Sequence, residues 1–129
     1  MSERSLAQKL QIKDGRKVRF VNPPEGYLDL LGGHLEHVHV LPEPDEPADI
    51  IQVFVHNRQE LEEQLPRLKT VLAPQGALWV TYHKGTSKVK TDINRDTIDA
   101  YARSVGLEGV AMIAVDDDWS ALRLKLSGE

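Results

Sequence analysis

The chain has 129 residues, of which 40% are hydrophobic and 28% are charged, a composition typical of one folded domain and too apolar for a disordered chain. Its formal net charge of −4 argues against binding along a nucleic-acid phosphate backbone. With no cysteine, disulfides, thiolate metal sites and a cysteine nucleophile are excluded. No segment approaches the ~18 apolar residues of a membrane span and no apolar leader follows Met1, so we expect a cytoplasmic protein without membrane or nucleic-acid partners.

The first third of the chain predicts short helices that alternate with short strands. A helix capped by Ser5 is expected to bury Leu6 and Leu10, and Asp14-Gly15 then forms a turn. The following elements are a strand over 17–21, a helix over 25–31 that ends at the glycines 32 and 33, and a strand over 38–41.

The centre of the chain begins with a Pro-rich acidic segment, 42–49, which cannot be helical. The apolar run 50–55 predicts a buried parallel strand. Asn57 and Glu60 resemble a capping box for a helix kinked at Pro66 and stopped by Pro74 and Gly76. Its apolar face is expected to carry Leu61, Leu65, Leu68 and Leu72.

The last third predicts a strand over 77–82, a helix capped by Asn94 and a buried strand over 110–115. Ile98, Ala102 and Val105 share one face of that helix. Leucines 122, 124 and 126 alternate with basic residues, which indicates a strand with one polar face. Only the four residues 116–119 precede this strand, so we expect an antiparallel hairpin.

These elements predict an α/β fold with a three-layer, Rossmann-like, mainly parallel sheet and an antiparallel C-terminal strand, in a single domain over 1–129. The strand 17–21 is expected to lie between the strands 38–41 and 50–55. Ligands of such sheets bind beyond the carboxyl ends of the strands.

Two stretches carry a resemblance to a known family. Residues 12–18, Ile-Lys-Asp-Gly-Arg-Lys-Val, and residues 68–80, through Leu72-Ala73-Pro74-Gln75-Gly76-Ala77-Leu78, resemble the Rossmann-like class I methyltransferases. The resemblance implies a reduced methyltransferase-like topology. The chain is also similar to a family of small uncharacterised bacterial proteins, which supplies no activity; its motifs are Ser5-Leu6-Ala7, Pro24-Glu25-Gly26-Tyr27, Lys88-Val89-Lys90-Thr91-Asp92 and Asp118-Trp119-Ser120.

The loop after the first strand departs from the methyltransferase pattern. The family has Gly-x-Gly-x-Gly there, whereas this chain has Asn22-Pro23-Pro24-Glu25-Gly26. Prolines lack N–H donors and side chains block close approach, so we expect S-adenosylmethionine not to bind in its usual pose, and the sequence names no cofactor. Glu43 could stand in for the ribose-binding acid of the family.

The segment 42–49 replaces a helix and a strand of the larger enzymes. In polyproline geometry it forms an extended strap of roughly 25 Å. Such a strap covers less apolar sheet than a helix, so we expect a homodimer that buries the remaining surface.

The carboxyl edge of the sheet is the expected site of a small anionic ligand. The loop 83–91 concentrates three lysines and three hydroxyl groups around one glycine, next to a helix N-terminus. His56 and His83 end two neighbouring strands and can act as acid or base near neutral pH. The predicted ligand-binding residues are Asn22, Tyr27, His56, His83, Lys84, Ser87, Lys88, Lys90 and Thr91.

Other candidates have simpler structural interpretations. His34, His37 and His39 lack a complete metal-ligand set, and the acids Asp116, Asp117 and Asp118 are expected to face water in the hairpin turn, so no metal site is predicted. Asp92 and Asn94 are expected to cap the next helix. The two tryptophans, Trp79 and Trp119, are expected to be core or hairpin anchors.

Three functions therefore remain open. The first is a small anion-binding domain without an assigned reaction, the second a non-catalytic protein-interaction module, and the third a working methyltransferase. Clustering of Lys84, Lys88 and Lys90 with Asn22 and Tyr27 around a concave pocket would favour the first. A flat apolar patch would favour the second.

Overall fold

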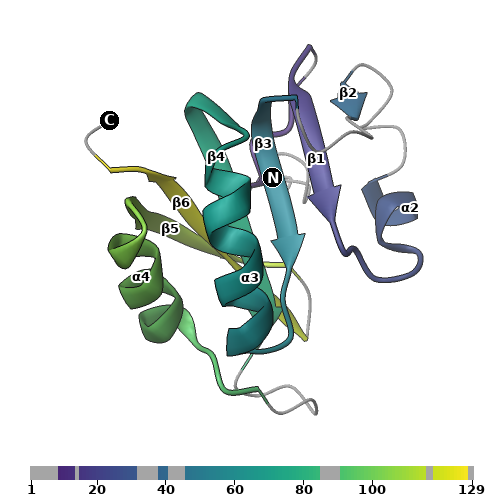
Figure 1. Ribbon diagram of the computed structural model, residues 1–129. Coiled ribbons are helices and arrows are strands. Elements are labelled where there is room, and N and C mark those ends of the chain that lie inside the picture. Colours follow the sequence, from purple (N-terminus) through teal and green to yellow (C-terminus); the bar gives the residue numbers. More distant parts are fainter. Residues whose placement is uncertain are drawn as a thin grey trace.

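The computed structural model describes residues 9–13, 15–31, 38–40, 46–84, 91–115 and 118–127. They form a six-stranded sheet in the order β2-β1-β3-β4-β6-β5 (Figure 1). The strands are β1 (Lys17–Val21), β2 (His39–Val40), β3 (Ala48–Phe54), β4 (Leu72–His83), β5 (Leu107–Ala114) and β6 (Trp119–Leu126). The helices are α2 (Tyr27–Leu31), α3 (Arg58–Lys69) and α4 (Arg95–Ser104).

The strand directions confirm the predicted fold class. β1 is parallel to β2 and β3, and β3 is parallel to β4. β6 is antiparallel to both of its neighbours, β4 and β5. The predicted position of β1 between β2 and β3 is also correct, and the sheet is mainly parallel with one reversed strand near its end.

Two apolar layers sandwich the sheet. On one face, α3 and α4 bury leucines and isoleucines such as Leu65 and Ile98 against β3, β4 and β6. On the other face, α2 and the segment around Leu10 pack on Trp79. The Trp79 indole Nε1 donates to the Leu10 carbonyl oxygen at 3.0 Å, which fixes the N-terminal segment beneath β4 and confirms Trp79 as a core residue.

Side-chain caps start both long helices. The Asn57 side chain accepts from the Glu60 backbone N–H at 2.9 Å, but the Glu60 carboxylate turns to His56 instead of completing the expected box with Asn57. α4 has the reciprocal pair, because Asn94 accepts from Thr97 N–H and the Thr97 hydroxyl oxygen accepts from Asn94 N–H. Each cap satisfies backbone donors that a helix start leaves without partners.

Two predicted boundaries around β4 were wrong. α3 ends at Lys69, and β4 begins at Leu72 instead of residue 77, because Leu72 pairs with Ala48. The strand passes Pro74 through an irregularity in which Gln75 adopts a φ of +62°. An added Cβ at Gly76 would lie 2.8 Å from the Ala73 carbonyl oxygen and 2.9 Å from that of Asp49, so the close packing of the backbone here favours glycine. The glycine does not end a helix, in contrast to the prediction from the sequence.

Three other predicted elements differ in extent. α2 starts at Tyr27 and not at residue 25, because Gly26 has a left-handed φ of +81° and Tyr27 N–H closes a turn on the Pro24 carbonyl. β2 comprises two exposed residues. β5 is not buried as expected but is the last strand of the sheet, with Val110 and Met112 46% and 48% exposed, because only β6 pairs with it among the described residues.

The described end of the Pro-rich segment is tied to β1. Lys17 Nζ lies 3.2 Å from the Glu46 carboxylate, and Arg19 donates to the Glu46 carbonyl oxygen at 2.7 Å. The rest of the predicted strap, Glu43 included, and the predicted helix at Ser5 lie outside the described residues, apart from Lys9 and Leu10 at the end of that helix. None of the helices in the described part of the chain has the length and apolar character needed to cross a bilayer.

Candidate functional site

The carboxyl ends of β3 and β4 meet the start of β6 at one edge of the sheet. His83, the last residue of β4, pairs with Trp119, the first of β6. Beyond that pair, the Lys84 N–H donates to the Asp118 carbonyl at 2.8 Å. Directly after β3, the Val55 N–H donates to the Thr81 carbonyl, which places the next residue, His56, beside the end of β4.

Three rings form a contiguous cluster at this edge. His83 stacks on Trp119 with ring centroids 4.0 Å apart and an interplanar angle of 28°. The His56 ring is 5.5 Å from the His83 ring and 5.7 Å from the Trp119 ring. His83 is only 6% exposed, whereas half of the His56 side chain is exposed, so the cluster has one covered and one accessible imidazole. The prediction that the two histidines are neighbours is confirmed.

Glu60 holds the accessible imidazole in place. Its Oε1 accepts from the His56 backbone N–H at 2.7 Å and lies 3.0 Å from the His56 Nδ1. Burial alone would raise the pKa of Glu60, but the backbone hydrogen bond, the ring hydrogen bond and the attraction of His56 together outweigh it and lower the pKa below its ordinary value of 4.5. Since Nδ1 is engaged by the carboxylate, Nε2 is the His56 nitrogen that can bind a ligand or exchange a proton.

The end of the lysine-rich loop is pinned to the same place. The Thr91 hydroxyl donates to the His56 carbonyl at 2.6 Å, and the Asp92 carboxylate accepts from the Arg58 N–H at 2.8 Å. Asp92 therefore caps α3 and not α4 as expected, because its carboxylate lies against the first residue of α3. Thr91 acts here as a donor to the backbone that carries His56.

The first loop contributes differently from the prediction. Tyr27 is only 4% exposed, and its hydroxyl donates to the Gln52 Oε1 at 2.7 Å, while the Gln52 amide donates to the Thr81 hydroxyl. Its ring packs edge-on against Phe54, which in turn packs edge-on against Trp119. Tyr27 is thus a core residue that supports the ring cluster from below, and not a surface ligand contact.

The loop 22–26 differs from the glycine-rich loop that methyltransferases of this fold have after the first strand. Pro23 and Pro24 have no N–H group, and the Tyr27 N–H is committed to the turn. Asn22 holds a left-handed φ of +57° with an exposed side chain, and an added Cβ at Gly26 would meet nothing within 4 Å. The two prolines therefore remove two of the backbone donors with which Rossmann loops hold a nucleotide-like cofactor, and the turn occupies a third.

The remaining predicted residues divide into those described and those not. Lys84 is described and half-buried beside the cluster, whereas Ser87, Lys88 and Lys90 lie outside the described residues. So do His34, His37, Asp116 and Asp117; His39 is exposed on β2. Within the described ranges no group of three or more His, Asp or Glu side chains could hold a metal ion.

Two members of the site were not predicted as such. Glu60 stands four residues after His56, and its carboxylate reaches back past the N-cap Asn57, so this local contact could have been found from the sequence. Trp119 was expected to be an anchor, and it does pack on Phe54, but its stacking on His83 depends on the β4–β6 register, which spans more than thirty residues.

Comparison with known proteins identifies the class of fold. No protein-family model matches this sequence, and no curated protein matches it. A SAM-dependent methyltransferase from Aquifex aeolicus has a TM-score of 0.65 at 16% identity, covering 92% of this chain and 86% of that one. The DhpI–SAH complex gives 0.64 at 11% identity, covering 97% and 83%. The ribosomal protein L11 methylase from Lactobacillus delbrueckii subsp. bulgaricus gives 0.62 at 11% identity, covering 95% and 77%.

The protein therefore has the Rossmann-like fold of class I methyltransferases, as the sequence resemblance implied. At these identities the similarity defines the fold alone.

Proposed function

We propose that this protein is a small-molecule-binding domain that takes a small anionic ligand at the carboxyl edge of β3, β4 and β6, and that it does not hold S-adenosylmethionine in the usual pose. We further propose that it belongs with the small uncharacterised bacterial proteins it resembles and acts in the cytoplasm. Binding is the proposed activity, and no reaction is assigned.

The observation that carries the proposal is the ring cluster. His56, His83 and Trp119 come from three different strand ends and converge within 6 Å of one another. Glu60 fixes the orientation of His56 and leaves Nε2 as the nitrogen for a ligand. Lys84 adds a positive charge at the same edge, and ammonium groups bind anions through charge-assisted hydrogen bonds. A doubly protonated His56 ring, with one N–H on Glu60, would present Nε2–H as a further donor.

The composition of the edge supports an anion over a cation. Two carboxylates at this edge are hydrogen-bonded, Glu60 to His56 and Asp92 to the start of α3. In the sequence, Lys84, Lys88 and Lys90 follow the end of β4. An anionic group would therefore meet donors there, while a metal cation would meet carboxylates that are already hydrogen-bonded.

A methyltransferase is the competing function, since the similar structures include a SAM-dependent methyltransferase and a complex with SAH. A calorimetric titration separates the two. We expect S-adenosylmethionine and S-adenosylhomocysteine to bind with a Kd above about 10 μM, corresponding to less than roughly 7 kcal/mol of binding free energy. A tighter Kd would favour the methyltransferase and overturn the second half of the proposal.

A thermal-shift screen over inorganic phosphate, sugar phosphates, nucleotides and carboxylates tests the first half, because a ligand that binds the native state raises its apparent stability. We expect His56→Ala to weaken the strongest hit about tenfold or more, and Lys88→Ala with Lys90→Ala to weaken it by about 1 to 3 kcal/mol. His39→Ala is the matched control, since that histidine is exposed on the distant edge strand β2. Equal affinity of the His56 and His39 variants would refute the site.

A further inference from the structure

The outer edge of β5 carries an apolar stretch without charged side chains. Residues 109–114 read Gly-Val-Ala-Met-Ile-Ala, and Val110 and Met112 are about half exposed. Among the described residues, no strand pairs with this edge. Protein sheets usually protect such an edge with a charge, a proline or a covering element, because its open backbone groups attract other strands.

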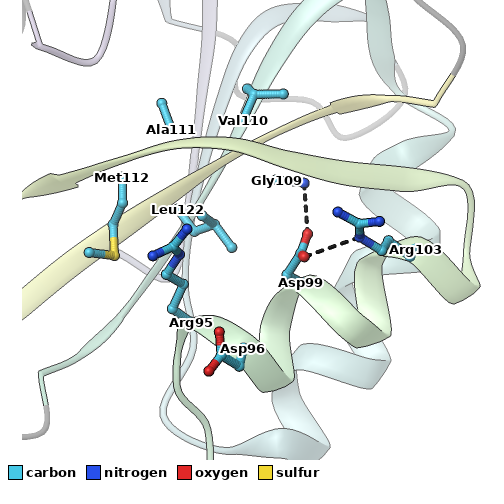
Figure 2. Close-up of a pocket in the computed structure, with 9 residues that line it drawn as sticks. All are labelled: Arg95, Asp96, Asp99, Arg103, Gly109, Val110, Ala111, Met112 and Leu122. Carbon is cyan, nitrogen blue, oxygen red and sulfur yellow. Dashed lines mark hydrogen bonds and ion pairs between the residues drawn. The ribbon is translucent and has the colours of Figure 1, made fainter.

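α4 protects only the first part of this edge. The Asp99 carboxylate accepts from the Gly109 N–H at 2.9 Å and also binds Arg103 Nε at 3.1 Å (Figure 2). Along a strand, the backbone groups of successive residues point to opposite sides. The Val115 N–H points to β6, where it donates to the Trp119 carbonyl oxygen, so the backbone groups of Met112 and Ala114 point away from β6. The stretch from Met112 to Ala114 is therefore an open antiparallel edge.

A groove of about 200 Å³ runs between this edge and α4. Arg95 extends from the start of α4 toward Leu122 and Met112, with Asp96 beside it (Figure 2). Within the described part of the chain, neither Arg95 nor Asp96 makes a side-chain ion pair or hydrogen bond. Two adjacent opposite charges without partners can satisfy each other across a two-fold axis, because in such an interface each residue meets its counterpart reciprocally.

We propose that β5 is the dimer interface, with the β5 strands of two copies paired antiparallel about a two-fold axis at Met112. The pairing joins the two sheets into one and satisfies the outward backbone groups of Met112 in both copies. It sets Ala111 opposite Ile113 of the second copy, a small side chain against a large one, and brings Arg95 toward Asp96 of the second copy. A second copy of β5 has the same length and the same apolar side chains as the edge it covers, and its Asp96 complements Arg95. The interface does not depend on the proposed ligand site.

Light scattering after size exclusion and analytical ultracentrifugation over micromolar to millimolar concentrations test the interface. We expect a dimer for the unmodified chain. Met112→Lys should raise the dimer Kd at least tenfold, because it sets two ammonium groups at the axis. Val40→Lys is the matched control: Val40 is 42% exposed on β2, the opposite edge of the sheet, and its replacement should leave the dimer unchanged.

The charge pair supplies a second test on exposed residues outside the strand. Arg95→Asp alone should weaken the dimer, and combining it with Asp96→Arg should restore most of the affinity, while circular dichroism verifies the fold of each variant. A monomer at millimolar concentration overturns the proposal, as does a dimer that Val40→Lys dissociates and Met112→Lys does not. Failure of the charge swap to restore a dimer weakened by Arg95→Asp overturns the proposed Arg95–Asp96 contact.

Discussion

The loop after β1 and the ends of β3 and β4 lie at the same edge of the sheet but offer a ligand different chemistry. The loop 22–26 has two prolines and one left-handed asparagine, and its Tyr27 N–H is consumed by a turn. The other region presents two imidazoles, an indole and an oriented carboxylate. In this fold, loss of backbone donors at one strand end can thus coexist with a dense side-chain cluster two strands away.

Trp119→Ala should show the largest effect, because that ring joins the two regions. Its indole packs on His83 and on Phe54, which carries the contact on to Tyr27. We expect a loss of about 2 to 4 kcal/mol in the free energy of unfolding, since a large and mostly covered ring leaves a cavity. Urea denaturation measures it; a loss below about 1 kcal/mol would mean that the cluster is a surface assembly without a structural role.

Tyr27→Phe tests whether the first loop supports the cluster from below. The variant keeps the ring but removes the hydroxyl that donates to Gln52, which leaves a buried amide oxygen without that donor. We expect a loss of about 1 to 3 kcal/mol in unfolding free energy, measured by the same denaturation. Ligand affinity should change little, since Tyr27 is buried; a selective loss of affinity at unchanged stability would instead place Tyr27 in the binding site.

Glu60→Gln tests how much the negative charge of Glu60, beside His56, contributes to stability. Because the folded-state pKa of Glu60 lies below its ordinary value of 4.5, its stabilising effect is complete above that pH and is lost as the pH falls through the folded value. The pair is more than one-third exposed, so we expect less than about 1 kcal/mol at pH 7. The difference between the variant and the unmodified chain should shrink toward pH 3 in thermal melts; a difference that grows on acidification would contradict the lowered pKa.

Asn22→Gly should have the smallest effect. It tests whether Asn22 or the two prolines make the first loop unsuitable for the cofactor. Asparagine tolerates the left-handed backbone, and glycine adopts it freely, so unfolding free energy should change by no more than about 0.5 kcal/mol. The variant should still not bind S-adenosylmethionine tightly, because Pro23 and Pro24 remain. Tight binding by calorimetry would show that the asparagine side chain, and not the prolines, closes the loop.

Local patterns in the sequence determined most of the fold and some of the site. Apolar runs located β1 and β3, and the caps at Asn57 and Asn94 located the starts of α3 and α4, because helix caps and buried strands depend on adjacent residues. The same patterns misplaced the start of β4, because the close approach of Gly76 to both Ala73 and Asp49 of the neighbouring strand is not visible in a local pattern.

The tertiary structure decided most of the contacts within the site. The predicted strand order already brought His56 beside His83, but the stacking on Trp119 and the burial of Tyr27 beneath the cluster follow from strand register over distances that no local pattern encodes. The exposure of Val110 and Met112 was likewise invisible in the sequence, since an apolar run has the same composition in a central strand and at an edge. A central strand is covered by a neighbouring strand on each side, whereas among the described residues β5 pairs with β6 alone.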